Sequence, residues 1–591
     1  MSGTSVVERT TVRRPVAPPG HPGRDWRADL AVLGACVAIA LYLTYGMWLD
    51  PNHRAVAHNQ GDQALFEWLL SYAAYSPTHG ANPWWTTLLN HPMGANLAVN
   101  PSMVVVGGLL TPVTLTLGAS VSFLVVLTLN LILTPYAWYH VLSRHLVRTR
   151  AAAVLGGLFC GYAPGMVSHG NGHLNFSAQY LVPFVLLWTL RLRDPRHPVR
   201  NGVVLGVLVA LAFSIGAELL FFVALGCAVF LLAWAAQNRA AARAVAPVFA
   251  RGAAVAAGVA AVLLAYPLYM QFAGPQRYHG IGFDQRVHSE DLLAFGAVPY
   301  LSPGRLLGLW VKLAPNWTEE TTFFGVPLLV LTVVCFVVLW RRRVVRAMAV
   351  TAVVFAILAL GPRLHVGGYW TGLMLPYAAL ARLPVFNSAL PARFALMLIP
   401  IVGLLLAFAV DRARRSDRRR LWYAGIAVAL LPIVPLSIPA ATRDPVPHFF
   451  TDGTWRQYVH SGQTLVPVPP ASDLLPDGQR WQVATNFGFA IPDGFFLGPG
   501  PDGRSQIGPI RRPTYELLEL AALNGYDPVV MDYDRQQARL DLAYWHASVV
   551  VLSDGGRGSR WTDNRDLLRR LVTELLGPPR RVDDVWLWRV G

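Results

Sequence analysis

The stretch ADLAVLGACVAIALYLTYGMWL, residues 28–49, decides the class of fold, because it is a continuous apolar run of bilayer-spanning length. A spanning helix needs about 20 mostly apolar residues. The run has no small-residue cleavage site, which indicates an uncleaved anchor and not a removed signal peptide. Four arginines precede it, so we expect residues 1–27 to form a disordered basic tail on the cytoplasmic side. These are Arg13, Arg14, Arg24 and Arg27.

The composition of the whole chain agrees with a membrane protein. Of 591 residues, 54% are hydrophobic and 14% are charged, whereas a soluble protein has about a quarter charged residues. The formal net charge of +16 comes from arginines that gather in short loops between apolar runs, which is a topology signal. We therefore expect no nucleic-acid partner. The four cysteines lie inside apolar runs, without zinc-binding spacing, so no disulfide framework is indicated.

Further apolar runs bring the expected number of spans to about 11. They are residues 120–142, 151–168, 174–190, 201–215, 218–236, 252–271, 323–340, 347–361, 394–410 and 421–439. Arginine-rich loops follow every second span, as the positive-inside rule requires of cytoplasmic loops. The intervening loops then face outward; the main ones are 50–119, 272–322 and 362–393. The sequence predicts a multi-pass protein of the cell membrane with a cytoplasmic N-terminus.

Two segments do not fit the series of spans. Residues 101–118 are apolar enough to cross, but a crossing there would invert every later loop, so we expect a re-entrant or interfacial helix. Residues 441–591 are polar, with β-like runs at 463–470, 547–554 and 583–590 and helical patterns between them. The predicted fold is mainly α: a transmembrane helical bundle over 28–440 with a C-terminal extracytoplasmic α/β domain.

Acidic side chains beside a bilayer are costly and are therefore candidates for function. Asp62 is the second residue of the stretch GDQALFEWLL, residues 61–70, just beyond the first span, and Glu67 follows five residues later, on a different face of a helix. Asp62 is a candidate catalytic carboxylate. The alternative is an interfacial helix N-cap, a position for which aspartate is well suited.

The turn SHGNGHLN, residues 168–175, is the second candidate. It holds His169, Asn171, His173 and Asn175 between two spans. Imidazole nitrogens and amide oxygens could bind a phosphate group or a divalent metal ion. The alternative is a polar turn in which glycine and asparagine serve left-handed backbone.

The other candidates lie where later spans meet the outer face. Glu218 begins a span and is either a ligand or a cap, and of Glu319 and Glu320 we expect only one to point into a membrane-level cavity, because adjacent residues diverge. Arg393 could bind phosphate with its fork of donors, or it could simply extend to the interface. His91 belongs to a polar strip in the first outer loop. No nucleotide-binding or hydrolase motif occurs in a plausible context.

The order of these features resembles the polytopic GT-C glycosyltransferases, and more narrowly the YfhO-like bacterial membrane proteins. The resemblance covers most of the chain. It is carried by the following stretches: GDQALFEWLL…NPWWTTLLNHPMGANLAVNPS, GHLN, EETTFFG, LPVFNSALPARFALML, RWQVATNFGFAIPDGFF and YWHASVVVLSD.

The resemblance implies a transferase that moves a sugar from a polyprenyl-phosphate-linked donor to an envelope glycan or lipid acceptor. It implies that Asp62 is the catalytic carboxylate, with the histidine turn and Arg393 near the donor phosphate and Glu319 or Glu320 as a second acid. GT-C enzymes can use a divalent cation, Mg²⁺ or Mn²⁺, but no paired acids lie in the first two outer loops. Two other functions stay open: a transporter or flippase of lipid-linked precursors, and a non-catalytic membrane protein that binds glycan.

Overall fold

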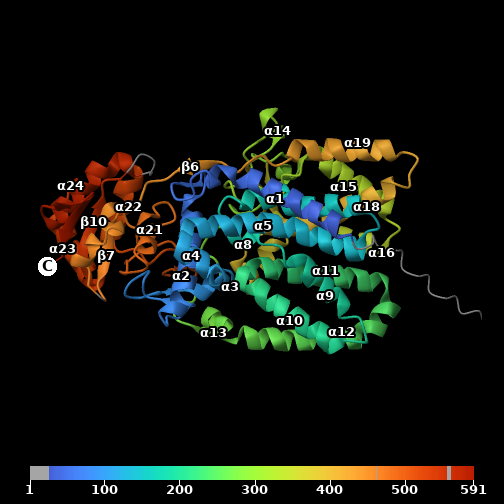
Figure 1. Cartoon of the computed structure of the whole chain (residues 1–591), viewed down its shortest axis with the longest axis horizontal. Coiled ribbons are helices and arrows are strands. Elements are labelled where there is room, and N and C mark those ends of the chain that lie inside the picture. The colour runs from blue at the N-terminus through green and yellow to red at the C-terminus, as the bar shows by residue number, and fades with distance from the viewer. Residues whose placement is uncertain (1–24, 461, 556–560, 591) are drawn as a thin grey trace, which may run out of the picture.

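The computed structural model describes residues 25–460, 462–555 and 561–590. Most of the predicted tail 1–27 therefore lies outside the described residues. Helices from the first part of the chain run along the long axis of the molecule, and the C-terminal sheet lies at one end of that axis (Figure 1). We call this end of the bundle the domain end. The N-terminus of α1 (Trp26–Trp48) lies toward the other end.

Within the described residues, six helices are long and apolar enough to cross a membrane. These are α1, residues Ala119–Leu146 with α5 (Ala119–Val141), α10 (Pro198–Ile215), α11 (Ala217–Gln237), α12 (Arg239–Leu263), and Pro391–Ala413 with α18 (Leu398–Ala413). Two shorter apolar helices are α9 (Val182–Arg191) and α15 (Gly325–Leu339). The chain is therefore a membrane protein by its helices, and the expected count of about 11 spans is not confirmed.

Prolines account for part of the difference. The expected span 421–439 contains α19 (Arg419–Leu430), but Pro432, Pro435 and Pro439 follow within nine residues, and proline lacks the N–H that a continuing helix needs. Pro164 likewise separates α6 (Arg150–Tyr162) from α7 (Pro164–His169). The expected span 174–190 is divided into α8 (Leu174–Ser177) and α9.

The remaining helices of the bundle complete the chain order. They are α2 (Gln60–Thr78), α3 (Val104–Leu109), α4 (Thr111–Leu117), α13 (Ala265–Ala273), α14 (Pro303–Leu306), α16 (Arg343–Ala359) and α17 (Tyr377–Leu380). Residues 101–118 form the two short helices α3 and α4, neither of which is long enough to span. Helix α3 packs closely on α2, because a Cβ on Gly107 would lie 2.6 Å from the Cβ of Ala73.

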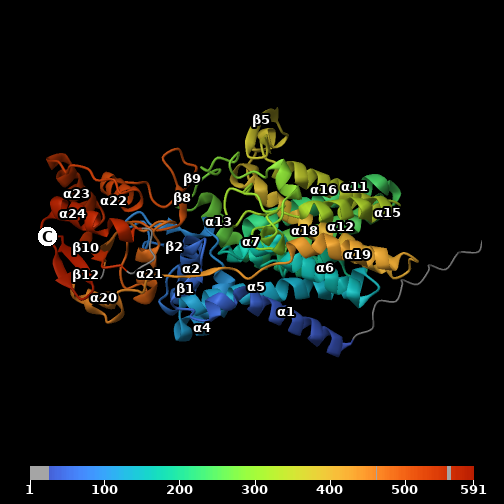
Figure 2. The ribbon, with the colours of Figure 1, turned by 90° about the horizontal axis from the view of Figure 1, so that it is seen from above.

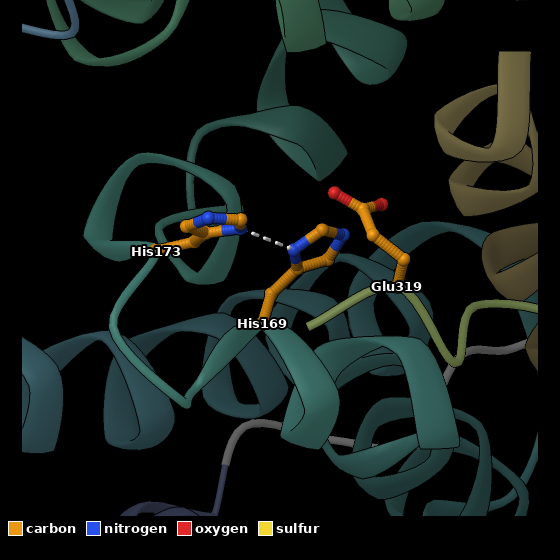
Figure 3. Close-up of side chains that lie close together, drawn as sticks. All are labelled: His169, His173 and Glu319. Carbon is orange, nitrogen blue, oxygen red and sulfur yellow. Dashed lines mark hydrogen bonds between the residues drawn. The ribbon is translucent and has the colours of Figure 1, made fainter. Parts of the chain in front are cut away.

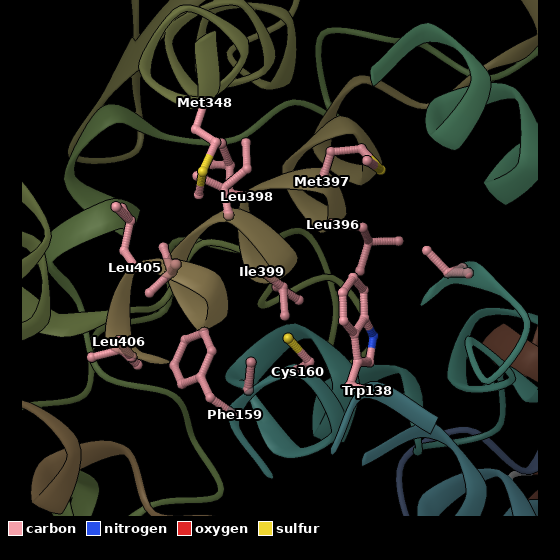
Figure 4. Packing of buried hydrophobic residues seen from close by; sticks show 14 of the residues in the cluster. Trp138, Phe159, Cys160, Met348, Leu396, Met397, Leu398, Ile399, Leu405 and Leu406 are labelled. Carbon is pink, nitrogen blue, oxygen red and sulfur yellow. The ribbon is translucent and has the colours of Figure 1, made fainter. Parts of the chain in front are cut away.

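The apolar core of the bundle is built around α6 and α18. Figure 4 shows Phe159 and Cys160 of α6 packed beside Ile399 and Leu406 of α18. Between helices in a bilayer, such side chains stabilise the bundle by close van der Waals packing and not by removal from water. This packing holds the α6–α7 segment, and hence the histidine turn that follows α7, in place.

The C-terminal part contains a four-stranded sheet in the order β11-β12-β10-β7. Its strands are β7 (Thr464–Val468), β10 (Ala547–Ser553), β11 (Arg580–Val582) and β12 (Val585–Arg589), and its helices are α20 (His448–Thr451), α21 (Asp477–Ala484), α22 (Pro513–Asn524), α23 (Asp532–Tyr544) and α24 (Arg565–Leu576). Strands β7 and β10 are parallel, whereas β10–β12 and β12–β11 are antiparallel. The strand and helix patterns predicted in this region therefore correspond to real elements.

Short two-stranded pairings connect the parts. Strand β1 (Arg54–Val56), just after α1, pairs with β6 (Ala440–Thr442), just before the C-terminal sheet. The others are β2 (Trp85–Thr86) with β3 (Ala95–Asn96), β4 (Arg363–Val366) with β5 (Tyr369–Met374), and β8 (Leu497–Pro499) with β9 (Ser505–Ile507). Figure 2 shows the β4–β5 hairpin projecting sideways from the bundle.

Candidate active site

Asp62 lies in the first turn of α2, at the domain end of the bundle. Its Oδ2 atom accepts a hydrogen bond of 2.5 Å from Asn59 Nδ2 and lies 3.0 Å from Nε2 of His173. Burial would raise the pKa of Asp62, but His173, Asn59 and Arg393 outweigh it and hold this pKa below its ordinary value. Asp62 is therefore ionised at neutral pH, and its side chain, which is 20% exposed, binds other side chains instead of capping α2.

The histidine turn supplies the next two groups. Helix α7 ends at His169, and Gly172, with φ of +115°, turns the chain so that His173 lies over it. The two Nδ1 atoms are 3.0 Å apart. When Nε2–H of His173 donates to Asp62, the Nδ1 of His173 accepts from Nδ1–H of His169, which leaves a lone pair on Nε2 of His169. That Nε2 is buried and has no hydrogen-bond partner among the described residues.

His169 is neutral at physiological pH. The side chain is fully buried, and burial lowers its pKa to about 3, although Glu319 acts in the opposite direction. A neutral imidazole with an unpaired nitrogen is the form in which histidine binds a metal ion.

Glu319 and Arg393 form the third part of the site. Arg393 donates from Nε and Nη2 to Oε1 of Glu319, at 3.0 and 2.8 Å, and from Nη1 to Oε2 of Glu218, at 2.8 Å. Burial opposes ionisation of Glu319, but Arg393 and the two histidines outweigh it and lower its pKa to about 2. The second oxygen of Glu319 is buried without a hydrogen-bond partner in the described part of the chain.

We call Asp62, His169, His173, Glu218, Glu319 and Arg393 the Asp62 cluster. Figure 3 shows His169 between His173 and Glu319. Ligand atoms of these three residues lie within 4.8 Å of one another. Two of these three residues carry a buried atom without a hydrogen-bond partner among the described residues: Nε2 of His169 and Oε2 of Glu319.

The charge and donor set of the cluster fit a divalent cation. Three carboxylates face one guanidinium, which leaves two negative charges when both histidines are neutral. A metal-binding imidazole commonly donates its other nitrogen to a carboxylate, as His173 does to Asp62. To bind a cation through Nδ1, His173 would exchange its hydrogen bond from His169 for the cation. Imidazole ligands suit Mn²⁺ or Zn²⁺ better than Mg²⁺, which prefers oxygen.

The other sequence candidates lie elsewhere. The ring of His91 contacts His546 at 5.6 Å between centroids, and its Nδ1 lies 3.2 Å from the carbonyl of Thr87, so it belongs to the contact with the C-terminal part. Asn175 packs beside Gly216, two residues before Glu218. Neither residue hydrogen-bonds to the Asp62 cluster within the described residues.

Glu320 points away from Glu319. Its two oxygens accept hydrogen bonds of 2.8 Å from the backbone N–H of Tyr300 and from Nε1 of Trp310. Burial raises its pKa to about 7 in spite of these bonds. Of the adjacent glutamates, it is therefore Glu319 that faces the cluster.

Sequence reasoning missed two polar residues around the cluster. Asn59 donates not only to Asp62 but also, at 2.9 Å, to the carbonyl of Asn171, so it holds the histidine turn against α2. Glu290 accepts from Thr322 at 2.8 Å, and burial raises its pKa well above the ordinary value, with Glu319 and Glu320 adding to the effect. Glu290 lies in a long loop without a recognisable motif, so only the fold could find it.

Comparison with solved structures defines the class of fold. The apo oligosaccharyltransferase of Archaeoglobus fulgidus superposes with a TM-score of 0.52 at 13% identity, over 89% of this chain and 69% of that one. The oligosaccharyltransferase AglB of the same organism, in complex with an inhibitory peptide and a dolichol-phosphate, gives 0.50 at 12% identity over the same shares. The Archaeoglobus fulgidus oligosaccharyltransferase in complex with Zn and sulfate gives 0.51 at 13% identity, over 88% and 68%. The chain thus has the fold of these membrane oligosaccharyltransferases.

The sequence itself identifies the family. Residues 31–436 match the family described as "Domain of unknown function (DUF6311)", and the chain belongs to that family. No curated protein matches the sequence. The resemblance to GT-C enzymes is thus supported at the level of fold, whereas membership of the YfhO-like group is not confirmed.

Proposed function

We propose that this protein is an integral membrane glycosyltransferase that moves a sugar from a polyprenyl-phosphate-linked donor to a cell-envelope acceptor on the outer face. The observation that carries the proposal is the hydrogen bond between Asp62 and His173 at the edge of a buried array of acids and histidines. This array lies in a fold shared with membrane oligosaccharyltransferases.

Asp62 acts as the general base in this proposal. It takes the proton of an acceptor hydroxyl while the acceptor oxygen bonds to the anomeric carbon and the bond from that carbon to the phosphate oxygen breaks. The phosphate leaves with that electron pair. His173 and Asn59 orient the carboxylate. Because its pKa is below the ordinary value, Asp62 is a weak base, and the proton moves late, when bond formation has made the hydroxyl acidic.

His169, His173 and Glu319 are the residues that would hold a divalent cation, with Asp62 bound to His173 behind them. Such a cation would supply positive charge to a leaving phosphate. Arg393 is less suited to bind the phosphate itself, because Glu319 and Glu218 already engage three of its donors. We assign it the role of positioning these two carboxylates.

The arginine pattern supports placing this site outside the cell. The loop that contains Asp62 and the C-terminal domain both fall on the outer side in that scheme. A solved neighbour in complex with a dolichol-phosphate and an inhibitory peptide supports a lipid-phosphate donor for a protein of this fold.

A transfer assay tests the proposal. The full chain, purified into lipid nanodiscs, is given radiolabelled polyprenyl-monophosphate and polyprenyl-diphosphate sugars with envelope extract as acceptor. Asp62→Asn preserves the size of the side chain but removes the base, so we expect transfer to fall at least ~100-fold. Asp50→Asn, in an exposed pair with His53, is the matched control. Undiminished transfer by Asp62→Asn, or none by the wild-type chain with any donor, would refute the proposal.

A further inference from the structure

A polar cavity separates the start of α2 from the C-terminal domain. Its volume is about 220 Å³, far above the roughly 10–15 Å³ that a single water requires. One wall is residues 57–61, which lead into α2, and the opposite wall is residues 473–477. Arg443, Asp444, Arg480 and Trp561 complete the lining. We call this space the interdomain cavity.

The interdomain cavity adjoins the catalytic carboxylate. Asn59 lines it and also donates to Asp62 at 2.5 Å. At one edge of the cavity its two walls meet, because a Cβ on Gly61 would clash with the carbonyl oxygen of Asp473. A molecule bound in the cavity would therefore lie beside Asp62.

The charges in the lining argue against a phosphate or a lipid tail. Arg480 donates from Nη1 to Asp477 at 2.9 Å and from Nη2 to the carbonyl of Asp444 at 2.6 Å. Arg443 donates from Nη1 to the buried Glu67 at 2.9 Å. Both guanidinium groups thus have acidic or carbonyl partners, and the aspartates of the lining outnumber them. An anion would be repelled, and an apolar chain would leave these groups without water.

The carboxyl of Asp473 lies in this lining without a side-chain donor among the described residues. Burial raises its pKa, and backbone N–H groups, its own and that of Leu474, act in the opposite direction. A neutral polyhydroxylated ring suits such a wall, because each hydroxyl both donates and accepts. A hydrogen bond to a charged group is stronger than one to a neutral group.

We infer that the interdomain cavity binds a neutral sugar unit of the acceptor, with the Asp473 carboxylate accepting hydrogen bonds from its hydroxyls. This inference rests on the proposed function and deepens it: the acceptor is a carbohydrate and not a peptide or a lipid. Asp473 is then a specificity-determining residue, whereas Asp62 carries out the chemistry.

Binding to the full chain in nanodiscs tests the inference without turnover. The probes are neutral hexosyl and pentosyl disaccharides, a tetrapeptide amide and inorganic phosphate. Binding of each probe to the Asp62→Asn chain is measured by saturation-transfer NMR. We expect a disaccharide to bind, Asp473→Asn to weaken it at least ~10-fold, and Asp502→Asn, an exposed acid paired with Arg504, to leave it unchanged. Leu474→Trp fills the cavity without removing a polar group and should also block binding.

The outcomes separate the inference from the proposed function. Disaccharide binding that depends on Asp473, with no transfer from any donor by the wild-type chain, supports the cavity and refutes the transferase. Transfer to a peptide, with no disaccharide bound at millimolar concentration, overturns the inference and leaves the transferase standing. Disaccharide binding that survives both Asp473→Asn and Leu474→Trp also overturns it. In the active chain, we expect Asp473→Asn to raise KM for the acceptor more than it lowers kcat.

Discussion

Nε2 of His173 lies 3.0 Å from Oδ2 of Asp62, although 111 positions of sequence separate the two residues. Asn59 fixes this approach, because its amide donates both to Asp62 and to the carbonyl of Asn171 within the histidine turn. The start of α2 and the turn between α7 and α8 are therefore one structural unit. A change in either segment moves both groups.

Metal binding is the first property to measure. We expect Mn²⁺ to bind the purified chain and His169→Ala or His173→Ala to weaken that binding at least ~10-fold, because each removes a ligand from a set of three. Mn²⁺ electron paramagnetic resonance gives the affinity directly. His91→Ala is the matched control, since His91 lies at the contact with His546. Equal affinity in all four proteins would exclude the proposed ligand set.

The two adjacent glutamates should differ in activity. Glu319→Gln removes the charge that faces the cluster, so we expect transfer to fall at least ~100-fold. Glu320→Gln alters a group bound to Tyr300 and Trp310 on the other side, so transfer should stay within a few-fold of the wild type. The assay is the donor panel described above. Equal losses in both variants would contradict the assignment of Glu319 to the site.

Glu320 should also give a pH-dependent contribution to stability. Its pKa in the folded chain, about 7, is higher than the ordinary 4.5. The folded state thus favours the protonated form, and this contribution is fully present below about pH 4.5 and is lost as the pH rises through 7.

Glu320→Gln cannot titrate and isolates that effect. The difference between the thermal midpoints of the wild type and the variant should decrease as the pH rises from 4.5 to 7. Above pH 7 this difference should become constant. Differential scanning fluorimetry in detergent provides both midpoints. A difference that is flat over this range would show that Glu320 has an ordinary pKa.

Arg393 should matter more for stability than any exposed arginine. Arg393→Gln leaves Glu218 and the buried Glu319 without their cation, and breaking a buried pair in this way costs about 3–5 kcal/mol. The double variant Arg393→Gln with Glu319→Gln should lose less than the sum of the single losses, because it removes one of the stranded charges.

The thermal midpoints of the three variants form a double-mutant cycle. Arg504→Gln, in an exposed pair with Asp502, is the control and should change stability by no more than about 0.5 kcal/mol. Additive losses in the cycle would mean that Arg393 and Glu319 are not coupled.

Hydropathy was enough to predict the long helices. The expected runs 28–49, 120–142, 201–215 and 218–236 correspond to α1, α5, α10 and α11. Hydropathy did not predict where a helix ends at a proline within apolar sequence, as after α19, because an average over a window is not sensitive to one missing backbone N–H. The alternating and amphipathic patterns beyond residue 440 did predict β7, β10, β12, α22 and α24.

The candidate site was predictable only as a set of residue types. Costly acids beside apolar runs drew attention to Asp62, Glu218 and Glu319, and the structure brings these together around Arg393. The sequence could not choose between Glu319 and Glu320, because the segment that carries them is irregular and has no helical phase. It also could not exclude His91, whose partner His546 is 455 positions away in the sequence. The roles of all these residues stay predictions.

The short pairing of β1 with β6 couples two distant parts of the molecule mechanically. Val56 pairs with Ala440, and the chain passes from Val56 to Asp62 within one further turn, while β6 leads directly into the C-terminal domain. The chain that enters the C-terminal region is thus paired with the strand that precedes the Asp62 carboxylate. A displacement of the C-terminal region relative to the bundle would therefore displace Asp62 as well, so the position of that region and the orientation of the carboxylate are coupled through the backbone.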